Sequence, residues 1–213
     1  GFICSIILGI YVAILYKDLP SVSAIETYIP AETTKILSTD NVVLAELYRE
    51  ENRAWINLND ISPALVQTVI AVEDSNFYNH GGLDFRGILR AIVKDIQAMS
   101  FVEGGSTLTQ QLARNLFLHR RRKISRKIAE AVLAVQIERK YSKDSILEFY
   151  LNQVYWGHNA YGIQSASLMY FGKSAQELTL AESALLVGML TGPELYSPYR
   201  NLKGAKRRQK IVL

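Results

Sequence analysis

The sequence predicts a predominantly α-helical protein with a small amount of β structure near its start. Three observations support this. From residue 61 onward, apolar residues recur at spacings of three and four, which is the period of an amphipathic helix. Between residues 20 and 59 polar and apolar residues alternate in short runs, which is typical of strands. The 213 residues are 49% apolar, enough for the core of one folded domain plus accessory segments.

The first segment, residues 1–16, contains no charged residue, and Lys17 is the first charge. A helix that crosses a bilayer needs about 20 apolar residues, so we expect an N-terminally truncated transmembrane anchor at residues 1–17. A signal peptide is the alternative, but a basic start and a small-residue cleavage site are missing. The weak Lys/Arg content after this run favours an exported domain. Cys4 is the only cysteine, so the exported part has no disulfide.

Residues 18–60 are predicted to be a linker with a small β-hairpin, whose strands span residues 35–37 and 42–48 around a Thr39-Asp40-Asn41 turn. The domain proper is expected at residues 61–213. Its helices are predicted from capping residues and apolar spacing. They span residues 63–73 after the N-cap Ser62, 83–99, 106–118 with Ser106 as N-cap, 122–140, 142–151, 180–190 after a Thr179–Glu182 capping box, and 203–213.

Charge is unevenly distributed along the chain. Residues 105–143 contain ten Lys/Arg and two acids, a local charge of +8 within a net charge of +4. Such a patch indicates either an anionic partner or a solvated face. Nucleic acid, an anionic membrane surface and a phosphorylated substrate are all compatible with it, and the expected export makes nucleic acid the weakest of the three.

Two adjacent acids, Glu73 and Asp74, stand at a predicted helix end before a loop with Phe77, His80 and two glycines. Neighbouring helical residues point in different directions, so only one of the two carboxylates is expected to face a cleft. Desolvation beside aromatic rings raises a carboxyl pKa, as a general acid or base near neutral pH requires. On residue chemistry alone, solvated acids at a helix end are the stronger interpretation.

Two further segments contain groups that suit an anionic sugar ligand. A helix start is predicted at Gly104-Gly105-Ser106-Thr107-Leu108-Thr109-Gln110-Gln111. Its free backbone amides could bind an anion, and its polar side chains could bind sugar hydroxyls. An ordinary Ser-capped helix start explains the segment equally well. On the next helix, Arg126 and Lys127 share a face with Glu130. This arrangement suits a diphosphate clamp, and equally a surface ion-pair ladder.

Read in order, these segments resemble the peptidoglycan glycosyltransferase family, which is shared by class A penicillin-binding proteins and monofunctional transglycosylases. All five sequence blocks of the family are present between Glu73 and Leu213, and the octet from Gly104 is highly specific. Residues 35–63 resemble the linker of the 1A type, with Asn41-Val42 where Asp-Gly is usual. The resemblance implies a bifunctional parent whose transpeptidase domain would follow Leu213.

The resemblance implies a lysozyme-like fold with a head lobe and a membrane-apposed jaw lobe, for which the hydrophobic residues 88–101 are suitable. It implies an inverting reaction that polymerises lipid II into β-1,4-linked glycan strands and releases undecaprenyl diphosphate. Glu73 would be the base, and Asp74 would orient the loop. No organic cofactor is expected. A divalent cation, Mg or Mn, is possible at the diphosphate, where Glu130 would bind it or hold the cations in register.

The remaining site residues follow from the same resemblance. Lys127 is the first candidate for a contact with the diphosphate, and Arg114, Arg122 and Arg126 are secondary candidates. Arg114 stands where the family often has lysine. The other substrate-binding residues are expected to be Ser106, Thr107, Gln110, Gln111, Asp74, Phe77 and His80. Expected partners are the growing glycan strand, membrane lipid, moenomycin-type inhibitors and other cell-wall synthesis proteins.

The expected location is the bacterial inner (plasma) membrane, with a single span and the catalytic domain on the periplasmic face. Two alternatives stay open. One is a lysozyme-like lytic enzyme. The basic cluster disfavours it, because the substrate of such an enzyme has no diphosphate for the cations to bind. The other is an inert membrane-anchored module that binds glycan, which the presence of both Glu73 and Glu130 disfavours.

Overall fold

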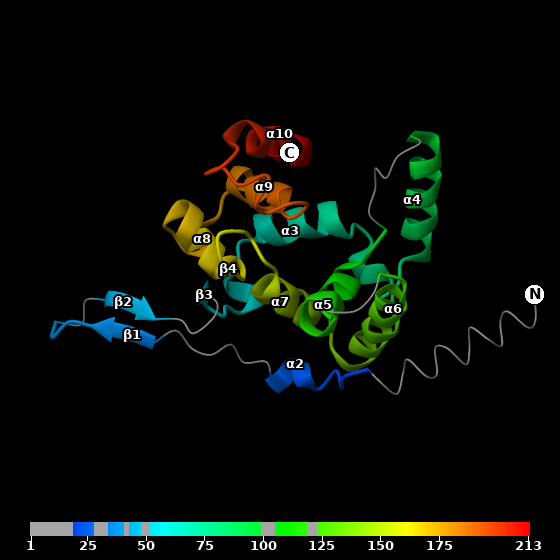
Figure 1. Ribbon diagram of the computed structural model, residues 1–213, viewed down its shortest axis with the longest axis horizontal. Coiled ribbons are helices and arrows are strands. Elements are labelled where there is room, and N and C mark those ends of the chain that lie inside the picture. The colour runs from blue at the N-terminus through cyan, green and yellow to red at the C-terminus, as the bar shows by residue number, and fades with distance from the viewer. Residues whose placement is uncertain (1–18, 28–33, 41–42, 48–51, 99–104, 119–122) are drawn as a thin grey trace, which may run out of the picture. The chain divides into compact units, whose positions relative to one another are not determined.

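The computed structural model describes residues 19–27, 34–40, 43–47, 52–98, 105–118 and 123–213. These residues are mainly helical, as predicted (Figure 1). The chain divides into two compact units. Unit 1 contains Gly1–Tyr28 and Asn76–Ile146, and unit 2 contains Ile29–Ser75 and Leu147–Leu213.

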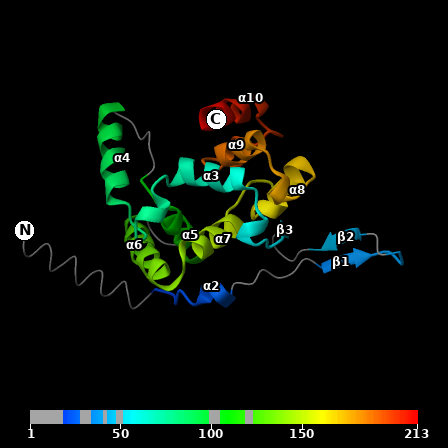
Figure 2. The same ribbon diagram turned by 180° about the vertical axis from the view of Figure 1, so that it is seen from behind.

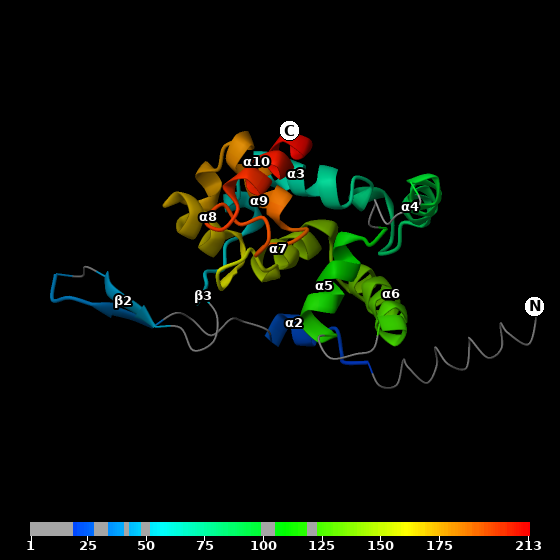
Figure 3. The same ribbon diagram turned by 45° about the horizontal axis from the view of Figure 1, so that its top comes forward.

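Unit 1 is built around two helices that lie side by side, α5 and α6 (Figure 3). Their apolar residues recur at helical spacing and fill the interface, and Leu112, Leu133 and Ile137 have no exposed surface. The described elements of unit 1 are α2 (Ala24–Thr27), the 3-10 turn η2 (Phe77–Asn79), α4 (Phe85–Ala98), α5 (Leu108–Phe117), α6 (Lys123–Lys140) and the first turn of α7 (Lys143–Gln153).

Unit 2 has a layered helical part in which α9 lies between α3 and α10, as both Figure 1 and the reverse view in Figure 2 show. Buried Leu65 and Val69 of α3 and Leu186 of α9 belong to its core. Its elements are β1 (Thr34–Leu37), β2 (Val43–Leu47), β3 (Asn52–Arg53), η1 (Leu58–Asp60), α3 (Pro63–Glu73), the rest of α7, β4 (Ala160–Tyr161), α8 (Ile163–Phe171), η3 (Ala175–Glu177), α9 (Leu180–Met189) and α10 (Leu202–Val212).

The predicted pair of strands is present as β1 and β2, which pair antiparallel with Thr34 opposite Leu47. A second pair was not predicted: β3 and β4 are parallel, with Asn52 opposite Ala160. Strands of two residues carry almost no periodic signal, which explains why the sequence does not reveal them. The assignment of residues 18–60 as a linker stays a prediction.

Two polar side chains of α7, buried Asn152 and half-buried Glu148, hold the segment before α3 within unit 2. Asn152 accepts a hydrogen bond from the Ile56 N–H at 3.0 Å and donates one to the Ile56 carbonyl at 2.8 Å. Glu148 accepts from the Leu58 N–H at 2.8 Å. These bonds satisfy backbone groups that no strand or helix pairs, and they hold the chain where it enters α3.

Most predicted helices agree with the structure to within a few residues, and the Thr179–Glu182 capping box is confirmed. The N-cap prediction for α5 is wrong, because Thr107 rather than Ser106 occupies that position. Ser62 does precede α3, but its hydroxyl donates to the Leu178 carbonyl at 2.7 Å instead of capping the helix. Helix α8 was not predicted.

Among the described residues, no helix combines the length and the apolar content that a membrane span requires. The anchor predicted at residues 1–17 lies outside those residues.

Candidate active site

The start of α5 is fixed by a reciprocal pair of hydrogen bonds. Thr107 Oγ1 accepts from the Gln110 N–H at 3.1 Å, and Gln110 Oε1 accepts from the Thr107 N–H at 3.0 Å. Thr107 Oγ1 also donates to the Gly82 carbonyl at 2.7 Å. Both side chains are buried and hydrogen-bonded to protein groups at the helix start, and their contact with a substrate stays a prediction.

Lys127 links the start of α5 to α6. Its Nζ donates to Ser106 Oγ at 2.6 Å and to Glu130 Oε2 at 2.7 Å. The Lys127 side chain is 53% exposed, whereas that of Glu130 is 1% exposed. A buried carboxylate therefore holds an ammonium group that still faces solvent, as a cation that receives an anionic ligand must.

Arg126 completes this cluster, because its Nε lies 3.2 Å from Glu130 Oε1. The pair is ionic without an aligned hydrogen bond. Glu130 thus meets one cation at each of its oxygens. Its role of holding cations in register at a diphosphate stays a prediction. We call Ser106, Arg126, Lys127 and Glu130 the α6 cation cluster. Arg122 lies outside the described residues, and Arg114 is partly buried in the last turn of α5.

The loop before α4 packs tightly against α6. Gly82 adopts φ +94°, and a Cβ there would lie 2.9 Å from the backbone of Ala134, so only glycine fits this close approach. His80 Nδ1 accepts from the Gly82 N–H at 3.2 Å. Phe77, predicted to bind substrate, has no exposed surface and packs edge-on against His80. Its placement therefore supports a packing role beneath the loop.

A second buried ion pair, which the sequence analysis missed, joins the loop to three helices. Glu138 Oε1 accepts from Thr109 Oγ1 at 2.6 Å and from Lys143 Nζ at 2.7 Å. Lys143 Nζ in turn lies 4.4 Å from the centroid of the Phe77 ring. The available signal was that Glu138 and Glu130 are the only acids in the basic run of residues 105–143.

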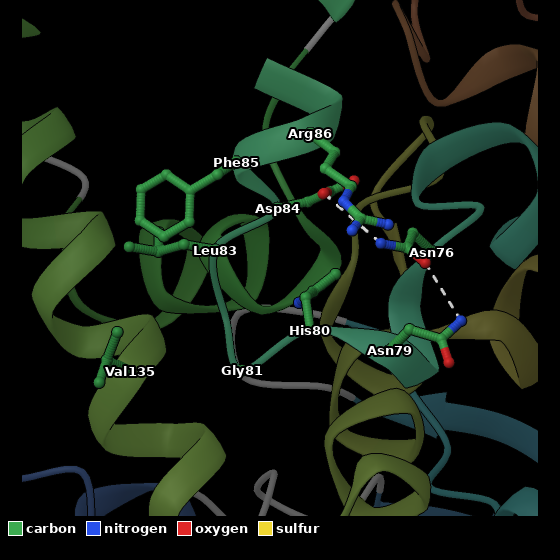
Figure 4. A pocket seen from close by; sticks show the side chains of 9 residues that line it. All are labelled: Asn76, Asn79, His80, Gly81, Leu83, Asp84, Phe85, Arg86 and Val135. Carbon is green, nitrogen blue, oxygen red and sulfur yellow. Dashed lines mark hydrogen bonds between the residues drawn. The ribbon is translucent and has the colours of Figure 1, made fainter. Parts of the chain in front are cut away.

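A pocket of about 890 Å³ opens beside this loop. Figure 4 shows apolar Leu83, Phe85 and Val135 on one side and polar Asp84 and Arg86 on the other, with His80 between them. The backbone N–H of Gly87 holds the pKa of the Asp84 carboxyl below its ordinary value. Asn76 and Asn79 complete the polar side. The pocket therefore offers a carboxylate, a guanidinium, amides and an apolar wall to one ligand.

Glu73 and Asp74 belong to unit 2, whereas the residues above belong to unit 1. Glu73 is the last residue of α3 and is partly exposed. Asp74 is the C-cap, with its N–H donating to the Ile70 carbonyl at 3.1 Å, and is only 7% exposed. The exposure of the two acids therefore differs in the direction that a base at Glu73 requires, and the assignment stays a prediction.

Within the described residues, no group of three or more His, Cys, Asp or Glu side chains is arranged to hold a metal ion. The two acids of the basic run are each engaged with cations of the protein, Glu130 by Arg126 and Lys127, and Glu138 by Lys143. A divalent ion at Glu130 would share the carboxylate with Arg126 and Lys127.

Comparison with known proteins identifies the family to which these residues belong. The transglycosylase family model matches residues 40–213. The chain belongs to the transglycosylase family. The peptidoglycan glycosyltransferase domain expected from the sequence blocks is thereby confirmed, and so is its relation to class A penicillin-binding proteins.

Two relatives show the extent of the similarity. Penicillin-binding protein 2D of Bacillus subtilis is 44% identical over 93% of this chain and 28% of its own length. Penicillin-binding protein 1A of Neisseria cinerea is 42% identical over 97% of this chain and 26% of its own length. The transglycosylase chain therefore spans about a quarter of the length of these curated relatives.

The chain is also similar to the crystal structure of penicillin-binding protein 1A from Haemophilus influenzae. That match has a TM-score of 0.46 and 22% identity, and it covers 86% of this chain and 18% of that chain. The family assignment rests on the sequence matches alone.

Proposed function

We propose that this transglycosylase polymerises lipid II into β-1,4-linked glycan with inversion. The 4-hydroxyl of the acceptor sugar attacks the anomeric carbon of the donor, the bond from that carbon to the diphosphate oxygen breaks, and undecaprenyl diphosphate leaves. The hydroxyl proton passes to a carboxylate, for which we propose Glu73. Proton removal during attack contributes about 10²- to 10⁴-fold to such a rate.

The observation that supports this function best is the α6 cation cluster. The leaving diphosphate gains negative charge as its bond to the sugar breaks, so fixed cations beside it stabilise the transition state selectively. Lys127 is exposed and held between Ser106 and Glu130, so little rearrangement is needed to receive a phosphate oxygen. Arg126, Arg122 and Arg114 are proposed to add charge nearby. A divalent cation, Mg or Mn, is also proposed at the diphosphate, where it would add positive charge, and no step is derived through it.

We assign the pocket beside His80 to a sugar of the glycan. Sugars combine polar hydroxyls with an apolar ring face, and this pocket combines Asp84, Arg86 and two asparagines with the apolar wall at Phe85. Its volume lies within the range of about 300–1,000 Å³ that small-molecule sites occupy. Gln111 and Ser106 are proposed to contact the substrate from the start of α5.

The finer fold and location belong to the same proposal. Helix α4 exposes one apolar face, with Phe85 73%, Leu89 64%, Val93 45% and Ile96 71% exposed. We infer that this face belongs to the jaw lobe of a lysozyme-like fold and dips into the lipid interface. The protein would then be anchored in the plasma membrane by residues 1–17, with this domain on the periplasmic face and a transpeptidase domain after it. Moenomycin-type inhibitors and other cell-wall synthesis proteins are further proposed partners.

The test is Glu73→Gln in a polymerisation assay with labelled lipid II. We expect the rate to fall at least about 100-fold, because an amide cannot accept the hydroxyl proton. Binding of lipid II or of a moenomycin-type inhibitor should persist. The matched control is Glu177→Gln, an exposed glutamate of the same unit whose capping bond glutamine can replace.

Polymerisation at the normal rate would remove Glu73 from the mechanism. The same assay separates the alternatives, since a lytic enzyme would shorten labelled glycan chains and an inert binding module would leave their length unchanged.

A further inference from the structure

Helix α10 has a row of cations that the proposed function does not use. Lys203, Lys206, Arg207 and Lys210 recur at spacings of three and four, so they share one face of the helix. All four are exposed. We call these four residues the α10 basic face.

Arg208, on the same helix, is a cation whose guanidinium contacts other side chains of the protein. Its guanidinium donates to Thr191 Oγ1 at 2.7 Å and lies 5.6 Å from the centroid of the Tyr196 ring. In the described part of the chain, by contrast, no acid forms an ion pair with the α10 basic face. Residues 195–213 contain six Lys/Arg and no Asp/Glu, so this segment supplies no counterion of its own.

Aliphatic side chains border the basic face on both sides. With 100° of rotation per residue, Leu202 and Ile211 fall at opposite edges of the row of cations. They are 53% and 67% exposed. The opposite side of the helix packs on α9 through Ala205, so the basic face points away from α9.

We propose that the α10 basic face binds the surface of an anionic phospholipid bilayer. The four cations would contact lipid phosphates and carboxylates, and Leu202 and Ile211 would enter the boundary between headgroups and acyl chains. An acidic protein could neutralise the cations, but a bilayer also has an apolar layer beneath its charges, which suits the aliphatic edges. The proposal uses no residue of the candidate active site and does not depend on the glycosyltransferase reaction.

The test places a polarity-sensitive fluorophore at the edge of the face. It uses the full chain with Ile211→Cys in a Cys4→Ser background, mixed with vesicles of phosphatidylcholine alone or with added phosphatidylglycerol. We expect a blue shift with the anionic vesicles only. The shift should reverse in high salt, because salt screens exposed charges.

A pair of matched variants assigns the effect to this face. Because the predicted anchor and the α4 face can hold the chain on either vesicle type, the quantity measured is the ratio of lipid-contacting to water-exposed probe. Lys203→Gln with Lys206→Gln is expected to lower this ratio about 25-fold on anionic vesicles, since each cation near such a surface contributes about fivefold. Arg139→Gln with Lys140→Gln removes the same charge from an exposed part of α6 and should leave the binding unchanged.

Equal shifts with both vesicle types, or equal losses in the two double variants, would overturn the proposal. So would the same shift with soluble polyglutamate, which would identify an acidic polypeptide as the partner. Lipid II polymerisation in detergent should be normal in the Lys203 and Lys206 double variant, so this test and the test of Glu73 fail separately.

Discussion

The cations of α6 and those of α10 differ in what surrounds them. On α6, Arg126 and Lys127 meet the two oxygens of Glu130, a carboxylate that is 1% exposed. On α10, the four cations of the basic face meet no acid in the described residues. Spacings of three and four residues occur on both helices. On α6 they separate the two cations from Glu130, and on α10 they separate the cations from one another.

Pairing with a buried acid, rather than charge density, therefore distinguishes a preorganised anion site from a basic face that can meet any anionic surface. A cation fixed by a buried carboxylate keeps one position. Binding of a ligand to this cation therefore costs little side-chain entropy. Exposed cations without counterions remain mobile and favour any extended anionic surface in proportion to their number. Substitutions on α6, α7 and α10 test this contrast.

The largest effect is expected for Glu130→Gln. The substitution keeps the volume but leaves Arg126 and Lys127 without a counterion, so the cations no longer hold their positions at the leaving diphosphate. We expect kcat/KM for lipid II polymerisation to fall at least about 100-fold. Unfolding free energy should drop by only about 1 kcal/mol, because both cations can turn to solvent. Normal turnover in this variant would remove the α6 cation cluster from the reaction.

The second effect concerns the ion pair that holds the loop. Lys143→Met leaves the Glu138 carboxylate, 7% exposed, without its cation. We expect the unfolding free energy to fall by about 2 kcal/mol, measured by denaturant titration. The control is Lys173→Met, which breaks a pair with Glu182 of the same 2.7 Å length but greater exposure. There the loss should be about 0.5 kcal/mol. Equal losses would contradict the role of burial.

The smallest effects compare two cations on one helix. Arg208→Gln removes the hydrogen bond to Thr191, and we expect it to lower the unfolding free energy by about 1 kcal/mol. Lys206→Gln should change it by less than about 0.5 kcal/mol, because Lys206 has no partner in the described residues. A large loss at Lys206 would mean that the basic face stabilises the fold, and the contrast between α6 and α10 would fail.

Local sequence signals predicted much of the helical framework. The Thr179–Glu182 box and Pro63 placed two helix starts correctly, because a capping bond and a proline at the first turn act within a few residues. The parallel strands β3 and β4 were missed, since their pairing joins Asn52 to Ala160. Such distant contacts leave no local period in the sequence.

The candidate site shows the same division. Spacing alone placed Lys127 and Arg126 on the face of Glu130, and the structure confirms both pairs. The sequence did not predict that Thr107 would be the N-cap of α5 while Ser106 contacts Lys127. Both roles depend on where α6 and the Gly82 loop lie beside α5, which no spacing within one helix encodes.

The order of the sequence blocks is enough to assign the family. Helical periodicity and the set of cations that share a helix face also follow from the sequence, because they depend on neighbours three or four residues apart. The tertiary structure decided which of those cations meets a buried acid. Glu130 and Glu138 are buried by the packing of α5 and the loop against α6, whereas the outward side of α10 meets no acid in the described residues. Burial is set by the other elements of the fold, and it separates the paired cations from the unpaired ones.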